Sequence, residues 1–107
     1  MKTLILTIGH NTPDGRTWSA EDVRAAFEDV TGCEAYTAMP CAGMWRGEAE
    51  ASTRIEVCAL DDAEASRLAG LVPALAAALL QQCIMAEVRE CAVMFVEAAA
   101  GEIAATA

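Results

Sequence analysis

A polar run near the N-terminus holds the first side chains that could do chemistry. It extends from His10 to Trp18 and carries Asp14 and Arg16 around a Pro-Asp-Gly turn signal. His10 is the only histidine, and histidine serves as a general base or a metal ligand in many sites. A loop histidine exposed to water is the favoured interpretation. Arg16 and Trp18 form an aromatic and cation pair that could grip a ligand.

A second group follows in the middle of the chain, where Trp45 is bracketed by two glycines and stands next to Arg46. Such a pair can hold a planar or phosphorylated ligand, anchor a protein partner or cover the end of a sheet. The acidic residues after it form a solvated face or an acidic surface that fits a basic groove. The candidate ligand-binding or partner-binding residues are His10, Asp14, Arg16, Trp18, Trp45, Arg46, Glu48, Glu50 and Arg54.

Metal and nucleophile chemistry find little support in the five cysteines. The pairs Cys33/Cys41 and Cys83/Cys91 are each eight apart, which matches no zinc finger or ribbon spacing. Cys41 is the most loop-like cysteine, but nothing marks it as a partner of His10. We therefore expect no metal, no cofactor and no catalytic residue. An odd number of cysteines without a C-x-x-C pair favours a reducing, cytoplasmic setting.

Composition narrows the set of partners. The chain has 107 residues and a net charge of −9, and its seven basic residues are scattered singly, so direct nucleic-acid binding is not expected. The longest apolar run, 68–80, falls short of the roughly 20 residues that cross a bilayer. Hydrophobic residues make up 55% of the chain, which favours burial of surface against a second copy in a homodimer or higher assembly.

Hydrophobic periodicity predicts the elements that position these residues. Pro40 is expected to mark a break at a sheet edge, and Pro73 to kink or split the second helix. We expect one domain over 1–97 with a weakly ordered tail over 98–107. Strands are predicted over 3–9, 33–39, 52–60 and 83–89, helices over 20–31 and 62–82, and a fifth short strand over 93–97.

This order, β-α-β-β-α-β, is that of a ferredoxin-like α+β sandwich, an antiparallel sheet with two helices on one face. The segment around Trp45 becomes a hairpin at the rim of the sheet. The other sheet face is open, and its mixture of apolar and charged groups favours burial against a second copy. On that open face the alternation places Ile5, Arg54, Glu56, Met85 and Glu87.

Two short motifs resemble a family of small ferredoxin-like proteins found in phages and bacteria. They are Gly43-x-Trp45-x-Gly47-Glu48-x-Glu50-x-Ser52 and Gln81-Gln82-Cys83-Ile84, the latter opening a strand. Together with the order of elements, the resemblance covers about nine-tenths of the chain. In that family the second motif commonly reads Asn-Gln-Glu-Ser, so Cys83 stands where the family has an acid. The resemblance implies the ferredoxin-like fold and no assigned activity.

Two functions are expected from these observations. The first is a non-enzymatic, phage-like binding protein that sequesters or inhibits a host component, either a defence protein or a nucleotide-like signal. The alternative is a small ferredoxin-like enzyme or ligand-binding domain of the monooxygenase-like kind, with its pocket between sheet and helices. The expected core is almost wholly apolar, while a catalytic pocket needs converging acid, base or metal groups, which favours the first.

Overall fold

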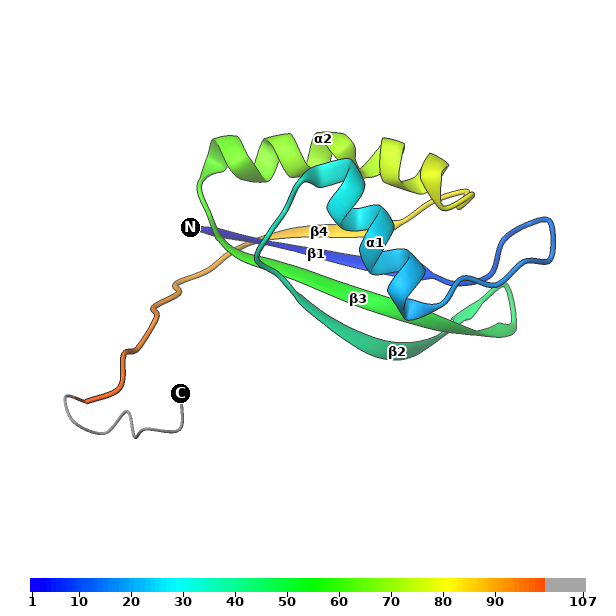
Figure 1. The fold of residues 1–107 in the computed structure, drawn as a ribbon, viewed down its shortest axis with the longest axis horizontal. Helices are drawn as coiled ribbons and strands as arrows, with labels where there is room; N and C mark the ends of the chain where they lie inside the picture. Colours follow the sequence, from blue (N-terminus) through cyan, green and yellow to red (C-terminus); the bar gives the residue numbers. More distant parts are fainter. Residues whose placement is uncertain (100–107) are drawn as a thin grey trace.

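The computed structural model describes residues 1–99 and shows four strands and two helices in that range. The elements are β1 (Lys2–Gly9), α1 (Ala20–Thr31), β2 (Thr37–Trp45), β3 (Glu48–Leu60), α2 (Asp62–Ala78) and β4 (Met85–Glu90). The strands pair antiparallel in the order β2-β3-β1-β4. Both helices cover one face of the sheet (Figure 1). This confirms the ferredoxin-like α+β sandwich.

The core lies between the sheet and the helices and follows from the alternation in β1. Leu4, Leu6 and Ile8 point toward the helices and are fully buried. They pack in one cluster with Phe27 of α1 and Leu75 of α2, each with 0% of its surface exposed. The opposite face of the sheet carries no helix, so the residues between these ones in β1 belong to the open face.

Both helices begin where local capping chemistry predicts. Ser19 accepts a hydrogen bond from Asp22 N, and the Asp22 side chain accepts one from Ser19 N, which forms a capping box. Gly32 ends α1 in the left-handed conformation, with φ of 67°. Asp61 caps α2 by accepting a 2.7 Å hydrogen bond from Glu64 N.

Strand β2 differs from its expected range. It begins at Thr37 instead of Cys33 and continues through Pro40 to Trp45. Pro40 is tolerated because β2 is an edge strand that pairs with β3 alone, so a missing amide donor is left at the free edge. Strand β3 begins at Glu48, four residues earlier than expected, since the hairpin ladder reaches that far.

Helix α2 is shorter than the periodicity predicts. It continues past Pro73 as one helix, so the predicted split is wrong, and it ends at Ala78 instead of about Gln82. Leu80 has a positive φ of 55°, which no continuing helix can accept, and this residue turns the chain toward β4. Strand β4 consequently starts at Met85.

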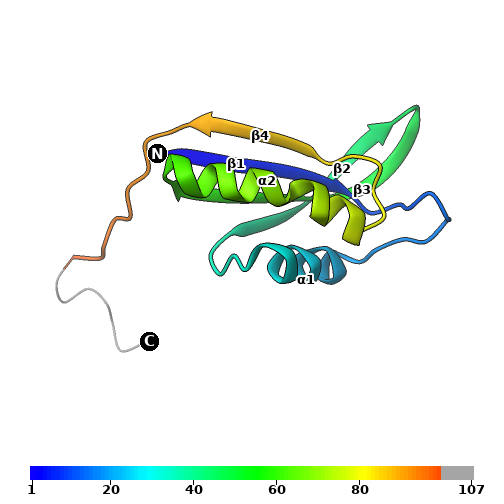
Figure 2. The ribbon, with the colours of Figure 1, turned by 90° about the horizontal axis from the view of Figure 1, so that it is seen from above.

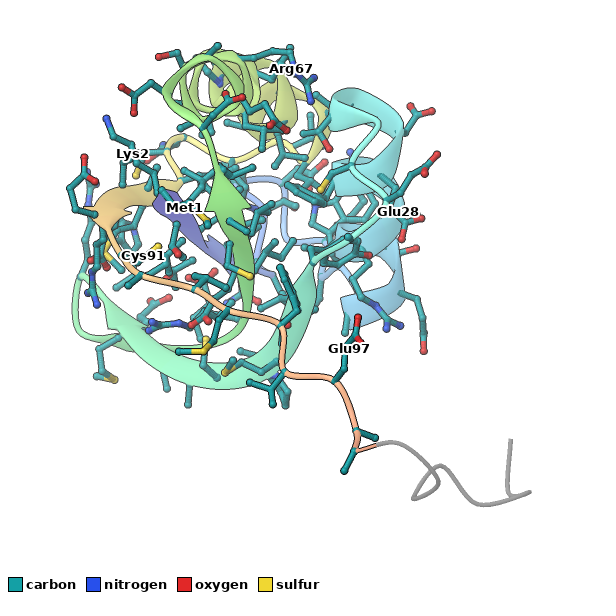
Figure 3. All side chains as sticks on the ribbon, turned by 90° about the vertical axis from the view of Figure 1, so that its left-hand side faces the viewer. Met1, Lys2, Glu28, Arg67, Cys91 and Glu97 are labelled. Atoms are coloured by element: carbon teal, nitrogen blue, oxygen red, sulfur yellow. The ribbon has the colours of Figure 1, made fainter. Side chains whose placement is uncertain are left out.

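The predicted fifth strand is absent. Residues 93–97 form no ladder and lead away from the sheet (Figures 1 and 3). The reason lies in β1, because Lys2 already pairs with Glu90 and Met1 O already accepts a hydrogen bond from Cys91 N. Both edges of β1 are occupied, one by β3 and the other by β4, so the segment after β4 has no place beside it. Of the expected tail over 98–107, positions 100–107 lie outside the described residues.

Candidate functional site

Three connections meet at one end of the sheet and surround a cavity of about 600 Å³ that is open to solvent. They are the loop after β1, the turn between β2 and β3, and the connection from α2 to β4, seen together at the right of Figures 1 and 2. Antiparallel pairing brings them together, because β1 ends where β3 and β4 begin. The cavity is lined by Thr7, Gly9, Asn11, Thr12, Pro13, Gly43, Met44, Trp45, Glu48, Glu50, Ser52, Gln81, Gln82, Cys83 and Met85.

The floor of the cavity belongs to the open face of the sheet. Thr7 and Gly9 alternate along β1 with the helix-facing core residues, and they pair with Met85 and Ser52. The space between sheet and helices, where sequence reasoning placed the alternative pocket, is filled by packed core residues. The cavity is therefore on the opposite side of the sheet from the pocket expected for the alternative function.

The β2-β3 hairpin forms one wall of the cavity. Arg46 and Gly47 make a two-residue turn with φ values of 49° and 82°, the geometry that suits a tight hairpin. Trp45 is 51% exposed, and the Arg46 guanidinium carbon lies 5.5 Å from the centroid of its ring. The predicted hairpin is confirmed, and the indole of Trp45 offers a flat apolar surface to a ligand in the cavity.

Two carboxylates of β3 lie beside this indole. Glu48 is exposed and pairs with Trp45 across the ladder. Glu50 is half-buried, and its Oε2 accepts a 3.0 Å hydrogen bond from the backbone amide of Asn11. An acceptor-only group held in this way keeps further acceptor capacity for a cation or a hydroxyl.

The opposite wall comes from the segment after α2. Gln81 Nε2 donates to Asn11 O at 2.9 Å and to Leu79 O at 3.3 Å, which ties this segment to the loop after β1. Gln82, Cys83 and Met85 complete the wall. Sequence reasoning did not list Gly9, Asn11 or Gln81 as site residues. Gly9 and Asn11 had no signal beyond their position at the end of a predicted strand, and Gln81 stood in a motif of the family resemblance to which no role was given. The strand order was needed to bring the three together.

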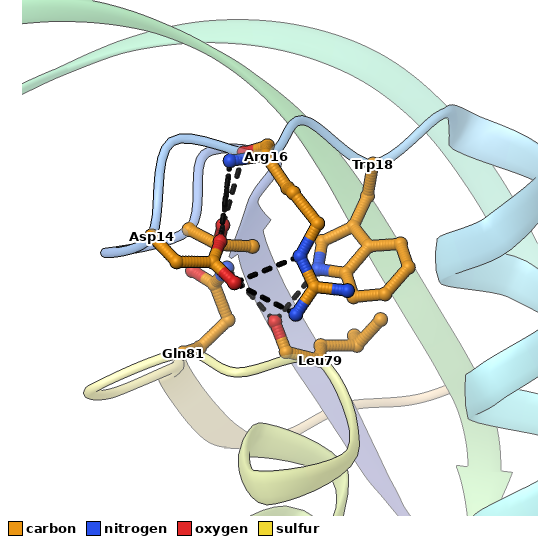
Figure 4. A network of polar contacts seen from close by, with 6 residues as sticks. Asp14, Arg16, Trp18, Leu79 and Gln81 are labelled. Atoms are coloured by element: carbon orange, nitrogen blue, oxygen red, sulfur yellow. Dashed lines mark hydrogen bonds and ion pairs between the residues drawn. The ribbon is translucent and has the colours of Figure 1, made fainter.

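The loop after β1 is held by its own polar network (Figure 4). Arg16 donates to Asp14 from Nε at 2.8 Å and from a terminal nitrogen at 2.7 Å, and Thr12 Oγ1 also donates to Asp14. These hydrogen bonds, that of Arg16 first, hold the pKa of Asp14 well below its ordinary value. Asp14, Arg16 and Trp18 lie outside the cavity lining, and their contacts are within the protein.

Trp18 differs from Trp45 in its surroundings. Its Nε1 donates a 2.7 Å hydrogen bond to Leu79 O at the end of α2, and its ring packs against the core. The Arg16 guanidinium carbon lies 5.8 Å from the ring centroid. These contacts join the loop to the helix layer.

His10 is not the exposed loop residue that was expected. Only 8% of its surface is exposed, and its Nε2 lies 2.7 Å from Oγ1 of Thr53, itself buried in β3. Its backbone also bonds to Ala51 O and Trp18 N, which holds the ring against the sheet. Arg54 lies on the open face, where its Nε is 2.9 Å from Glu56 Oε1. Neither His10 nor Arg54 lines the cavity.

Within residues 1–99 no three His, Cys, Asp or Glu side chains gather as metal ligands would. All five cysteines are free thiols, and Cys83 is the one on the cavity wall. Neither helix in that range has both the length and the apolarity needed to cross a membrane.

The fold is shared with a phage SAM lyase. A structure of that enzyme in its apo state superposes with a TM-score of 0.69 and 19% sequence identity, over 82% of this chain and 78% of the lyase. A second, in complex with S-methyl-5'-thioadenosine, gives 0.59 and 19%, over 83% and 80%. A DUF3240 family protein from Shewanella baltica OS155 gives 0.54 and 13%, over 91% and 97%. No family model and no curated protein matches the sequence.

These comparisons correct the expected function. A non-enzymatic binding protein that sequesters a host component was expected, with no enzymatic activity. That expectation is wrong, because the similar solved structures include an enzyme from a phage, and one of them contains a bound adenosine thioether. A resemblance to phage and bacterial proteins was expected, and these comparisons support it for the fold alone.

Proposed function

We propose that this protein binds S-adenosylmethionine in the cavity at the end of the sheet and cleaves it to S-methyl-5'-thioadenosine. The observation that carries the proposal is a cavity of about 600 Å³ whose hairpin wall carries an exposed indole and, on the neighbouring strand, a carboxylate held by a backbone amide. That volume lies inside the range of about 300–1,000 Å³ that small-molecule sites occupy. The fold it shares with a phage SAM lyase adds support.

The cavity offers a partner to each part of this ligand. The Trp45 indole suits stacking with adenine, and base stacking on an aromatic ring is worth about 1–3 kcal/mol. Gln82 and Asn11 present amide groups for the polar edges of the base and ribose. Glu50 supplies negative charge for the two cationic groups of the ligand, its sulfonium and its ammonium.

The proposed reaction needs no acid or base from the protein. The substrate's own carboxylate oxygen forms a bond to the γ carbon of the amino acid part, one of the three carbons attached to sulfur, which closes a five-membered lactone. The carbon–sulfur bond breaks, and its electron pair moves to sulfur, so the cationic sulfonium leaves as a neutral thioether. No proton is transferred and no water is consumed. The cavity has to bind the ligand in a folded conformation and exclude water from the reacting carbon.

The test is a product assay by liquid chromatography and mass spectrometry. Purified protein incubated with S-adenosylmethionine should release S-methyl-5'-thioadenosine and a lactone that carries no oxygen from labelled water. Trp45→Ala should lower the rate, while Cys58→Ser, an exposed change away from the cavity, should not. A protein that neither forms nor binds S-methyl-5'-thioadenosine would refute the proposal.

We also propose that the protein associates with copies of itself. The supporting feature is the apolar segment after β4, where Met94, Phe95 and Val96 are 83%, 79% and 83% exposed. Exposure of apolar side chains to water is unfavourable, and their burial stabilises an assembly by about 25 cal/mol per Å² of apolar surface. A second copy provides further exposed apolar side chains at the free edge of its sheet, Met85 and Val88 of β4, which point to opposite faces of that strand.

A further inference from the structure

Gly9 ends β1 at the floor of the cavity and faces the side chain of Glu50. A Cβ atom built on Gly9 would lie 2.6 Å from Cδ and 2.7 Å from Oε2 of Glu50, and nearer still to Oε1. Heavy atoms in a close-packed protein do not approach so closely without movement. The carboxylate of Glu50 therefore occupies the space that a side chain at position 9 would take.

Backbone conformation does not explain the glycine at this position. Gly15, Gly32 and Gly47 have φ values of 85°, 67° and 82°, in the left-handed region that favours glycine. Gly9 is not among the glycines with positive φ, and it lies in the regular ladder of β1 opposite Ser52. Extended backbone accepts alanine without strain. Alanine at position 9 would instead place a methyl group in the space that the Glu50 side chain now fills.

The clash would fall on the far end of a flexible side chain. Glu50 can rotate its carboxylate away while the ladder of β1 and β3 stays intact, so the cost to the fold is small. What would be lost is the position of the carboxylate in the cavity, where Asn11 N donates to Oε2 at 3.0 Å. Position 9 thus controls where the charge of Glu50 lies.

We propose that Gly9 is a positioning residue, whose missing side chain keeps the Glu50 carboxylate in the cavity and so makes the cavity prefer cationic over neutral adenosine ligands. This inference rests on the proposed function. S-adenosylmethionine carries a sulfonium and an ammonium group, whereas S-methyl-5'-thioadenosine is a neutral thioether. A half-buried carboxylate discriminates between them because its charge is screened less than that of a fully exposed group.

The preference has a consequence for turnover. A cavity that holds the cationic substrate more tightly than the neutral thioether releases this product as soon as the positive charge disappears. Binding and release are then controlled by the same carboxylate. Any change that moves the carboxylate should weaken binding of the cation and leave binding of the neutral thioether as it was.

Calorimetry with two probes tests this. Sinefungin, a non-cleavable analogue with an amine in place of the sulfonium, represents the cation, and S-methyl-5'-thioadenosine represents the neutral ligand. Gly9→Ala should weaken sinefungin binding by about fivefold, the upper end for an ion pair open to solvent. It should leave the thioether affinity unchanged. Gly70→Ala is the matched control, because a Cβ there meets nothing within 4 Å.

A double-mutant cycle separates positioning from other effects. In the Glu50→Ala background, Gly9→Ala should change sinefungin affinity no further, since the group it displaces is gone. Additive losses, or an equal loss for sinefungin and the thioether, would overturn the proposal. The Asn11 amide signal in a nitrogen-15 spectrum gives a readout without ligand, and it should shift in Gly9→Ala and Glu50→Ala but not in Gly70→Ala.

The two proposals can fail separately. If the wild type binds neither probe and forms no thioether, the proposed function is refuted, while the Asn11 signal still decides how Gly9 acts on Glu50. An Asn11 signal that stays unmoved in Gly9→Ala would overturn the positioning role even in an active protein.

Discussion

Trp18 Nε1 donates a 2.7 Å hydrogen bond to the carbonyl of Leu79, which joins the loop after β1 to the end of α2. The second tryptophan, Trp45, is 51% exposed on the cavity wall. One tryptophan therefore joins two elements of the fold and the other is exposed at the cavity, although each has an arginine within two residues in the sequence.

The two tryptophans should respond differently to removal. Trp45→Ala should leave the thermal midpoint nearly unchanged, because exposed substitutions cost within about 0.5 kcal/mol, and should weaken S-methyl-5'-thioadenosine binding by about 1–3 kcal/mol. Trp18→Ala should destabilise the protein by about 3 kcal/mol through lost packing. Melting curves and calorimetry of both variants decide the matter. A large loss of stability in Trp45→Ala would contradict its placement in the site.

Core packing gives a second prediction. Phe27 and Leu75 are fully buried and belong to one cluster, as the helical periodicity predicts. Phe27→Ala should lower the free energy of unfolding by about 3–5 kcal/mol and Leu75→Ala by about 2–5 kcal/mol. Urea unfolding measures both, with the exposed Ser66→Ala as a control on α2. Midpoints that hardly move would contradict the described core.

Charge at Glu50 should affect substrate binding more than the chemical step. In the proposed reaction the sulfonium loses its positive charge, so a carboxylate stabilises the ground state at least as much as the transition state. Glu50→Gln should raise KM by about fivefold and change kcat by less than about twofold. Steady-state kinetics with S-adenosylmethionine provides the measurement. A large fall in kcat at unchanged KM would show that Glu50 acts on the reacting atoms instead.

Tyr36 gives a prediction in alkaline solution. Burial, and then its hydrogen bond to Glu28 at 2.6 Å, raise the pKa of Tyr36 to about 12 from 10.0. Because the folded value is the higher one, the stabilisation is fully present below pH about 10 and is lost as the pH rises toward 12. Tyr36 is the only tyrosine, so phenolate absorbance reports on it alone. Tyr36→Phe should remove this part of the alkaline loss of stability.

Self-association makes the fifth prediction. At micromolar concentration the wild type should sediment as a dimer or larger assembly, because the segment with Met94 and Phe95 is buried between copies. Met94→Asp with Phe95→Asp should shift the protein toward the 11.2 kDa monomer without changing its thermal unfolding at low concentration. Glu97→Gln is the control in the same segment. A wild type that sediments only as a monomer would refute the association.

A non-enzymatic protein was expected because an apolar core offers none of the converging acid, base or metal groups that most catalytic pockets require. A sulfonium substrate already carries a good leaving group and its own carboxylate nucleophile, so such a site can consist of a stacking surface and one carboxylate. Trp45 and Glu50 were both visible in the sequence, but the roles proposed for them follow only from the proposed substrate.

Local patterns in the sequence determined β1, the starts of both helices and the core. Alternation in β1, the helical spacing around Phe27 and the caps at Ser19 and Asp61 act over a few residues, and each produced the expected structure. The tertiary structure alone decided the rest. Gly9, Glu50 and Gln81 meet because antiparallel pairing brings one strand end, one hairpin and one helix exit to the same place. That meeting depends on strand order and register, which no pattern confined to a single segment contains.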